Sequence, residues 1–358
     1  MTETHDNLLE RPEFFPVDID VKNEAFIFKE TCVEDLAQMA FHDMRSFTGD
    51  AYRLSFRTVR AHFDHGSTLR PAPRYIFHTA FCGSTLLARA LEFPARFFSY
   101  REPACLTRLA HLHSWRDVSP ELRTEVLHWT NQMLCRGVLA SEATIVKAHN
   151  ICSNLLPELF DHKLLYPAGR ALLLYSKPDD FIVAVLKHAD RRTWARKTFE
   201  AFGIQAVRGM PVNLDSKNDA QIAALLWAWH IEQCRRAEAV TGVTLATLRD
   251  RCFYAQPAAS LLRVSELLAL DLTAEECEAR ARGDVFCHDS KGGERFSRAQ
   301  RDREQAIERR AFDAEIGAAI DWLASTALCD LLQWPDRRHL SVPDLDGTSP
   351  TANTAQIT

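Results

Sequence analysis

Short apolar runs alternate with longer amphipathic segments along the middle of the chain. The apolar runs have the length of buried strands and lie at 75–79, 96–100, 143–147, 171–175 and 243–248. Segments with helical spacing of their apolar positions lie at 84–91, 119–135, 178–189 and 219–240. Because strands that alternate with helices in this way form parallel sheets, we predict an α/β fold with helices on both faces of the sheet.

Helix-start signals support two of these segments. Ser119 precedes a proline and a glutamate, the order expected for a cap, a first helical position and an early acid. Ser176 stands two residues before Pro178 and is predicted to cap the helix that begins there. The sequence after 250 is mostly helical in pattern, which predicts a helix-rich C-terminal part.

The two ends of the chain differ from its middle. Residues 34–64 have apolar positions at helical spacing, whereas residues 1–20 and 340–358 resemble tails. We therefore predict a partly helical N-terminal extension over 1–70, the α/β domain over 71–335 and a mobile tail over 336–358.

Composition narrows the classes of function. The chain is 46% hydrophobic and 25% charged, as globular proteins are, and its net charge of -5 argues against a nucleic-acid partner. Its ten cysteines include no C-x-x-C pair and no zinc-ligand spacing, so we expect no metal and a reducing compartment. No signal-peptide core or membrane-spanning run is evident, which favours a cytoplasmic protein with no membrane partner.

The loop after the first strand carries the most specific pattern. Cys82, Gly83, Ser84 and Thr85 join this strand to a helix, where unpaired backbone N–H groups and hydroxyls can bind an anion. A Walker A sequence is absent, because the lysine and the first glycine of that motif are both missing. An ordinary serine-capped strand–turn–helix would contain the same residues, so both interpretations stay open.

This loop resembles the 5′-phosphosulfate loop of sulfotransferases, whose pattern is P-[KR]-S-G-[ST]-[ST]. Cys82 to Thr85 match its S-G-[ST]-[ST] portion, while Phe81 replaces its basic residue and Ala80 its proline. The resemblance implies a P-loop sulfotransferase-like α/β fold. It also implies 3′-phosphoadenosine 5′-phosphosulfate as the donor co-substrate.

Two strand ends supply candidate catalytic residues. Lys147 and His149 follow the third strand and resemble the family's K-T-H motif, in which the histidine is the general base. A group that titrates near pH 6.5 suits proton abstraction in the cytoplasm, and the lysine could neutralise charge on the bridging oxygen. Glu102, after the second strand, is a second candidate base. A core or capping histidine and a surface carboxylate are the alternatives.

Further segments resemble the family's binding region for the 3′-phosphate. Ser176 and Lys177 precede Pro178 where the family has R-[DN]-P-x-D, and Lys187 is a nearby cation. Lys291 and Gly292 resemble a late basic-glycine element of the same site. A further cluster, in which Trp194 is surrounded by Arg191, Arg192, Arg196 and Lys197, is either a cationic wall of a site or a solvated face.

These patterns predict a transferase that moves a sulfuryl group from 3′-phosphoadenosine 5′-phosphosulfate to a hydroxyl or amine of a small-molecule acceptor. Two alternatives remain, a catalytically inactive nucleotide- or anion-binding module and a P-loop small-molecule kinase. The acceptor and the oligomeric state are left open by the sequence.

Overall fold

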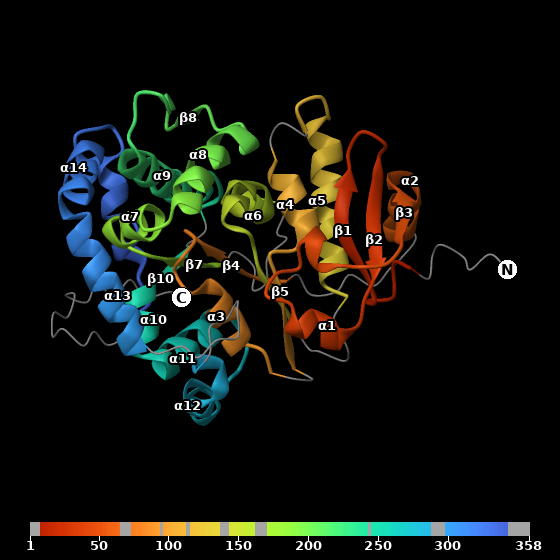
Figure 1. The fold of residues 1–358 in the computed structure, drawn as a ribbon. Coiled ribbons are helices and arrows are strands. Elements are labelled where there is room, and N and C mark those ends of the chain that lie inside the picture. The colour runs from red at the N-terminus through yellow and green to blue at the C-terminus, as the bar shows by residue number, and fades with distance from the viewer. Residues whose placement is uncertain are drawn as a thin grey trace.

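The computed structural model describes residues 8–64, 73–93, 96–111, 115–136, 143–161, 170–242, 245–287 and 298–342. Its central sheet has five parallel strands, which are β4 (Arg74–His78), β5 (Phe97–Arg101), β6 (Ala143–Lys147), β7 (Leu172–Tyr175) and β10 (Ala246–Arg249). Their order across the sheet is β10-β7-β4-β6-β5 (Figure 1). The predicted α/β fold class is therefore confirmed.

Helices connect and cover these strands. They are α3 (Ser84–Ala90), α4 (Ala104–Ala110), α5 (Pro120–Leu134), α6 (Leu156–Asp161), α7 (Pro178–Leu186), α8 (Ala189–Phe202), α9 (Asp219–Thr241), α10 (Asp250–Ala255), α11 (Pro257–Leu268), α12 (Ala274–Arg282), α13 (Arg298–Ala311) and α14 (Asp313–Ala324). Short 3-10 turns lie at Asn150–Leu155, Asp284–Phe286, Cys329–Leu332 and Asp336–Arg338, and β8 (Ala206–Val207) pairs with β9 (Met210–Pro211).

The sheet separates two hydrophobic cores. Tyr75 and Phe77 of β4 belong to one core, whereas Ile76 between them belongs to the other. Strand β7 divides in the same way, with Leu173 on one face and Leu172 on the other. Successive side chains of a strand point to opposite faces, so both faces of the sheet are apolar and need to be covered. Helix α9 covers one face and helix α11 the other (Figure 1).

The direction in which strands are added to the sheet reverses beside β4, which makes this a topological switch point. From β4 the chain passes outward to β5, returns to β6, and then crosses to β7 on the other side of β4. Open α/β sheets bind ligands beyond the carboxyl ends of strands at such a switch. A site is therefore expected where β4, β5 and β6 end.

Of the two predicted helix caps, Ser119 and Ser176, the structure confirms the first and not the second. Ser119 caps α5 by accepting a hydrogen bond from the Leu122 N–H. Ser176 does not cap α7, because Lys177 holds that position and the Ser176 hydroxyl donates to Asp250 Oδ2 at 2.8 Å. The second cap prediction is wrong because a buried carboxylate competes for the hydroxyl.

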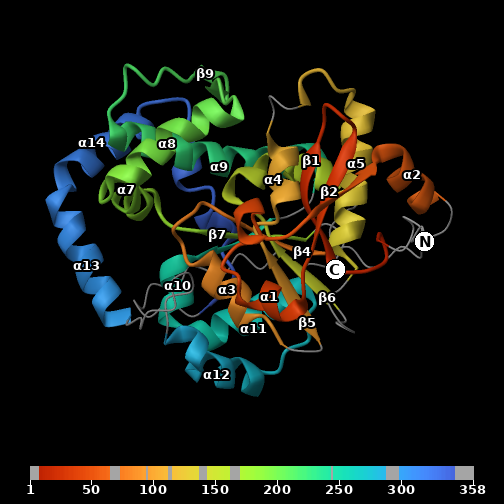
Figure 2. The ribbon, with the colours of Figure 1, turned by 45° about the vertical axis from the view of Figure 1, so that its right-hand side comes forward.

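The N-terminal region contains a second sheet. Strands β1 (Phe14–Asp20), β2 (Ala25–Glu30) and β3 (Ala51–Ser55) form an antiparallel unit, and α2 (Phe56–Asp64) follows β3 directly. Between β2 and β3 the chain forms α1 (Val33–Gln38), which lies near β5, and a 3-10 turn (Met44–Ser46) (Figure 2). The predicted helix over 34–64 is thus broken by a strand, and the predicted tail contains β1.

Two buried arginines attach this unit to the main domain. Arg136, after α5, donates to the backbone carbonyls of Leu8, Leu9 and Phe14. Arg101, at the end of β5, donates to carbonyls of α1 and of Met39. Both guanidinium groups bond to buried carbonyls of the N-terminal region from the main domain, so the N-terminal sheet is packed as part of the same body.

The last described residues also pack on the domain. The Leu340 N–H donates to the Thr247 carbonyl at 2.8 Å, and Val342 is buried. The rest of the predicted tail lies outside the described residues. Among the helices that the structure describes, none combines the length and apolar character required to cross a bilayer.

Candidate active site

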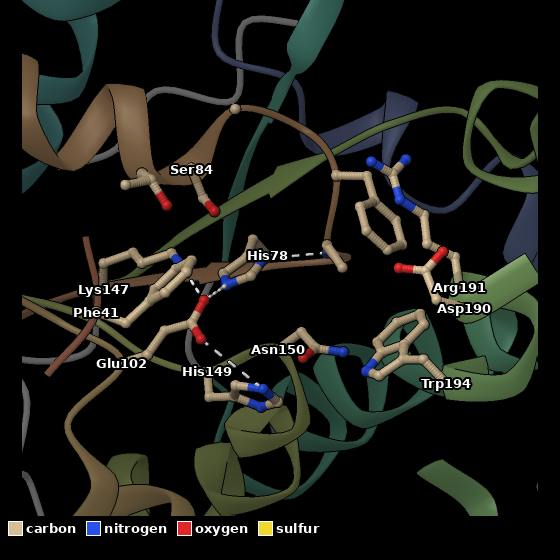
Figure 3. Close-up of a pocket in the computed structure, with 14 residues that line it drawn as sticks. Phe41, His78, Ser84, Glu102, Lys147, His149, Asn150, Asp190, Arg191 and Trp194 are labelled. Atoms are coloured by element: carbon tan, nitrogen blue, oxygen red, sulfur yellow. Dashed lines mark hydrogen bonds and ion pairs between the residues drawn. The ribbon is translucent and has the colours of Figure 1, made fainter. Parts of the chain in front are cut away.

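A cavity of about 360 Å³ opens at the carboxyl ends of β4, β5 and β6, where the strand order places the switch. Ten of its lining residues are labelled in Figure 3. The lining residues are Phe41, His78, Ala80, Phe81, Gly83, Ser84, Thr85, Glu102, Lys147, His149, Asn150, Asp190, Arg191 and Trp194.

The loop between β4 and α3 has an unusual backbone. Ala80, Phe81 and Gly83 all have positive φ, at 74°, 55° and 84°. Only glycine adopts this region freely, so the alanine and the phenylalanine are strained by about 1–3 kcal/mol each. The backbone N–H groups of Phe81 and Gly83 have no hydrogen-bond partner among the described residues. Such a concave run of N–H groups is suited to an anion.

Gly83 is needed for two reasons. Its φ of 84° disfavours any other residue, and a Cβ there would collide with the hydroxyl of Tyr254 on α10. The second constraint is tertiary, because 171 positions of sequence separate the two residues. Gly83→Val would therefore disturb packing as well as any anion site.

The predicted loop residues point in different directions. Ser84 and Thr85 line the cavity, are buried, and make no hydrogen bond through their hydroxyls to any described residue. Cys82 turns away and donates from Sγ to the Leu174 carbonyl, and burial raises its thiol pKa to about 12. Cys82 is thus a neutral packing residue, while the two hydroxyls are available to a ligand.

Glu102 is the centre of the site. Its φ is 57°, and Lys147 forms an ion pair with its Oε1. His78 Nε2 lies 3.7 Å from the same oxygen, and His149 Nε2 lies 3.8 Å from Oε2. The structure therefore brings together all three predicted catalytic residues and adds His78 (Figure 3).

Burial and charge set the protonation of this group. Burial alone would raise the pKa of Glu102, but Lys147 and the two histidines hold it well below its usual range. Burial lowers the pKa of His78 to about 3 and also lowers that of His149. Near neutral pH the site thus holds a carboxylate, an ammonium and two neutral imidazoles.

The hydrogen bonds of the histidines indicate their tautomers. His78 Nδ1 accepts from the Ala80 N–H at 3.0 Å, and His149 Nδ1 accepts from the Ile151 N–H at 3.4 Å. The hydrogen of each neutral ring is then on Nε2, the nitrogen that faces Glu102. Neither ring presents an open lone pair to the cavity, whereas His149 is the one ionisable partner of Glu102 Oε2 among the described residues.

A second cavity, of about 390 Å³, lies on the other side of Glu102. Its walls come from β1, the segment 41–45 and α4, and it shares Phe41, Glu102 and His149 with the first cavity. Asp18 of β1 crosses to Arg108 of α4 with contacts of 2.8 and 3.1 Å. The N-terminal sheet therefore completes this cavity.

Of the residues predicted to bind the 3′-phosphate, the three that the structure describes do not line either cavity. Ser176 is buried against Asp250, Lys177 lies 3.6 Å from Asp336, and Lys187 lies 3.1 Å from Glu308. Lys291 and Gly292 lie outside the described residues. The carboxylates at the start of α7 carry structural contacts instead, since Asp180 is buried and binds Arg251 at 2.7 and 2.8 Å and Arg309 at 3.0 Å.

Several lining residues were not identified from the sequence. His78 is the last residue of β4, so its place at a strand end was the available signal. Phe41 arrives from the N-terminal region, which no local pattern could show. Asn150 donates toward His230 of α9 at 3.1 Å, and burial lowers the pKa of that histidine to about 3. In the described chain, no group of three or more metal-ligating side chains occurs.

Comparison with known proteins adds little. No protein-family model matches the sequence, and no curated protein matches it. One similar solved structure is the sulfotransferase STF9 from Mycobacterium avium, with 12% identity and a TM-score of 0.40 over 72% of this chain and 82% of that chain. This likeness is too distant to assign residue roles or a substrate.

Proposed function

We propose that this protein is a sulfotransferase that moves a sulfuryl group from 3′-phosphoadenosine 5′-phosphosulfate to a hydroxyl or amine of a small acceptor. One observation supports the proposal above others. Two cavities meet at a shared wall of Phe41, Glu102 and His149. A transfer reaction needs two substrates held on either side of the reacting groups, and this arrangement provides two such places.

The donor is proposed to occupy the cavity beside the loop. Ser84 and Thr85 hydroxyls and the N–H groups of Phe81 and Gly83 would bind its 5′-phosphosulfate. The acceptor would occupy the second cavity with its reacting oxygen or nitrogen near Glu102. The hydroxyl and N–H groups beside the loop support the assignment of the donor, and the contact of the second cavity with Glu102 supports that of the acceptor.

The proposed reaction is an in-line displacement at sulfur. The acceptor oxygen forms a bond to sulfur while the bond between sulfur and the bridging oxygen breaks. 3′-Phosphoadenosine 5′-phosphate leaves with that oxygen and the electron pair. Lys147 and the Nε2–H of His78 lie where they can stabilise negative charge that develops in this step.

Glu102 is proposed to receive the acceptor's proton. Its Oε2 is the less engaged oxygen of the carboxylate, and the strained backbone of Glu102 directs it toward both cavities. The lowered pKa of Glu102 makes it a weak base, which suits a transition state in which the leaving group departs early. His149 would then position the carboxylate through its Nε2–H.

A ligand panel tests this proposal against the kinase and inactive-module alternatives. Thermal unfolding is followed with 3′-phosphoadenosine 5′-phosphate, ATP, GTP and adenosine 5′-phosphate. The true ligand at a hundredfold excess over its Kd should stabilise the folded state by about 2.7 kcal/mol. Preference for ATP would replace the proposal with the kinase. Binding of 3′-phosphoadenosine 5′-phosphate without turnover on any acceptor would favour the inactive module.

A further inference from the structure

The cavity beside the loop contains a cation whose charge is not matched by an ion pair. Arg191, in the first turn of α8, lines the cavity, and so does Lys147. Lys147 is paired with Glu102, whereas Arg191 has no carboxylate oxygen within 4 Å among the described residues. Asp190 lines the same cavity beside Arg191 without forming such a pair.

The guanidinium of Arg191 is held in place by the loop itself. Its central carbon lies 4.6 Å from the ring centroid of Phe81, and Trp194 packs against that ring edge-on at 5.2 Å. Stacking on an aromatic face leaves the N–H groups at the edge of the guanidinium free. Arg191 uses one of them, from Nη1 to the Ala184 carbonyl at 2.9 Å.

The neighbouring arginines of α8 show what a purely structural role looks like. Arg192 lies 3.5 Å from Asp219 and Arg196 lies 2.9 Å from the same carboxylate. Neither lines the cavity. Arg192 also donates to the Leu186 carbonyl, much as Arg191 donates to Ala184. Arg191 and Arg192 thus differ mainly in their surroundings. The guanidinium of Arg192 lies near a carboxylate, whereas that of Arg191 faces the cavity.

We propose that Arg191 binds a phosphate or sulfate ester that occupies the loop, and that stacking on the ring of Phe81 positions the Arg191 guanidinium. The identity of the ligand as the sulfuryl donor rests on the proposed function. The binding of an anionic group by Arg191 does not. A planar guanidinium can form two parallel hydrogen bonds to such a group. The cation of this site thus comes from α8 and not from the loop.

The test measures binding by calorimetry with two probes, inorganic pyrophosphate and 3′-phosphoadenosine 5′-phosphate. Arg191→Ala should weaken both by about tenfold or more, the scale expected for loss of a hydrogen bond to a charged group. Arg192→Ala, the matched control, should change affinity by less than about twofold. Phe81→Lys added to Arg191→Ala should recover part of the loss, because a lysine there places a cation in the same region.

The outcomes separate this inference from the proposed function. Unchanged pyrophosphate affinity in Arg191→Ala, or an equal loss in Arg192→Ala, overturns the role of Arg191. If the wild type binds pyrophosphate but not 3′-phosphoadenosine 5′-phosphate, the assignment of the donor is wrong. The role of Arg191 is still supported in that case, provided that the variants change pyrophosphate affinity as expected. Binding of neither probe overturns both. If Arg191→Ala does not fold, Arg191→Lys provides the test, with an expected smaller loss because the charge stays and the planar fork is gone.

Discussion

The two cavities that meet at Glu102 are built in different ways. The one beside the loop is made almost entirely by the α/β domain, namely by the segment from the end of β4 to the start of α3, by residues that follow β5 and β6, and by α8, while Phe41 is its contribution from the N-terminal region. The other requires β1 and the segment 41–45, both from the N-terminal region, to reach α4. Asp18 and Arg108, which face each other there, are 90 residues apart in sequence.

This difference has a consequence for how each cavity can be altered. The loop cavity depends on backbone conformation and a few hydroxyls, so its binding properties should respond to substitutions at the loop. The second cavity depends on how the N-terminal sheet is attached, and two buried arginines make that attachment. We expect donor binding and acceptor binding to be separable by mutation, with Glu102 affecting both cavities through the chemical step.

The largest effect is expected at the shared wall. Glu102→Gln removes the proposed proton acceptor and should lower kcat about a thousandfold, within the usual range for loss of general-base catalysis. Donor affinity, measured by calorimetry, should stay within about threefold because a base acts in the transition state. Because the pKa of Glu102 is held well below its usual range, the wild-type rate should be flat from about pH 5 to 8.

His149→Ala is the contrasting variant. If His149 only positions the carboxylate, its loss should cost less than that of Glu102 and should leave the pH profile flat. A wild-type rate that rises through the pKa range of histidine, and is lost in His149→Ala, would assign the base to His149 instead.

Acid should destabilise both regions together. Burial lowers the pKa of His42 in the N-terminal region, and of His78 and His230 in the α/β domain, to about 3. Unfolded histidines bind protons near pH 6.5, so the unfolded state gains protons first and the free energy of unfolding falls as pH decreases. Each histidine should contribute a loss of about 2.5 kcal/mol between pH 6 and pH 4.

Denaturant titrations at several pH values measure this loss. His42→Gln and His78→Gln should each reduce the slope of stability against pH by a similar amount. Separate unfolding transitions for the two regions, with only one of them sensitive to acid, would contradict the single packed body that Arg101 and Arg136 indicate.

A moderate effect on the donor is expected at the loop. Thr85→Val removes a cavity hydroxyl and should weaken binding of 3′-phosphoadenosine 5′-phosphate about tenfold, the scale of one hydrogen bond to a charged group. The acceptor KM should not change. Thr130→Val, at a buried threonine of α5 that bonds to the Val126 carbonyl, is the matched control and should leave donor affinity intact.

The smallest effect is expected in the second cavity. Asp18→Asn removes the ion pair with Arg108 of α4 and should raise the acceptor KM about fivefold, which corresponds to about 1 kcal/mol. Asp20→Asn is the control on the same strand, because Asp20 pairs with Arg53 outside both cavities. Equal effects of the two variants, or a change in donor affinity, would contradict the assignment of the acceptor to this cavity.

Local sequence determined much of the α/β domain. The five strands of the parallel sheet lie within a few residues of the predicted runs, because a buried parallel strand must be apolar on both faces. The loop from Cys82 to Thr85 and the strand ends at Glu102, Lys147 and His149 were predicted as site residues for a related reason, and all of them except Cys82 line a shared cavity. Polar residues that directly follow buried strands lie at the edge where ligands bind.

The tertiary structure decided the rest. The N-terminal strands pair with one another over a half-buried surface and carry no strong periodic signal, so 34–64 was predicted as a helix although β3 lies within it. The contacts of Glu102 with His78 and Lys147, and of Arg191 with Phe81, join side chains whose sequence neighbours give no sign of each other. Whether a cation is paired with a carboxylate or faces a cavity depends on which distant element packs beside it, and that is set by the assembled fold.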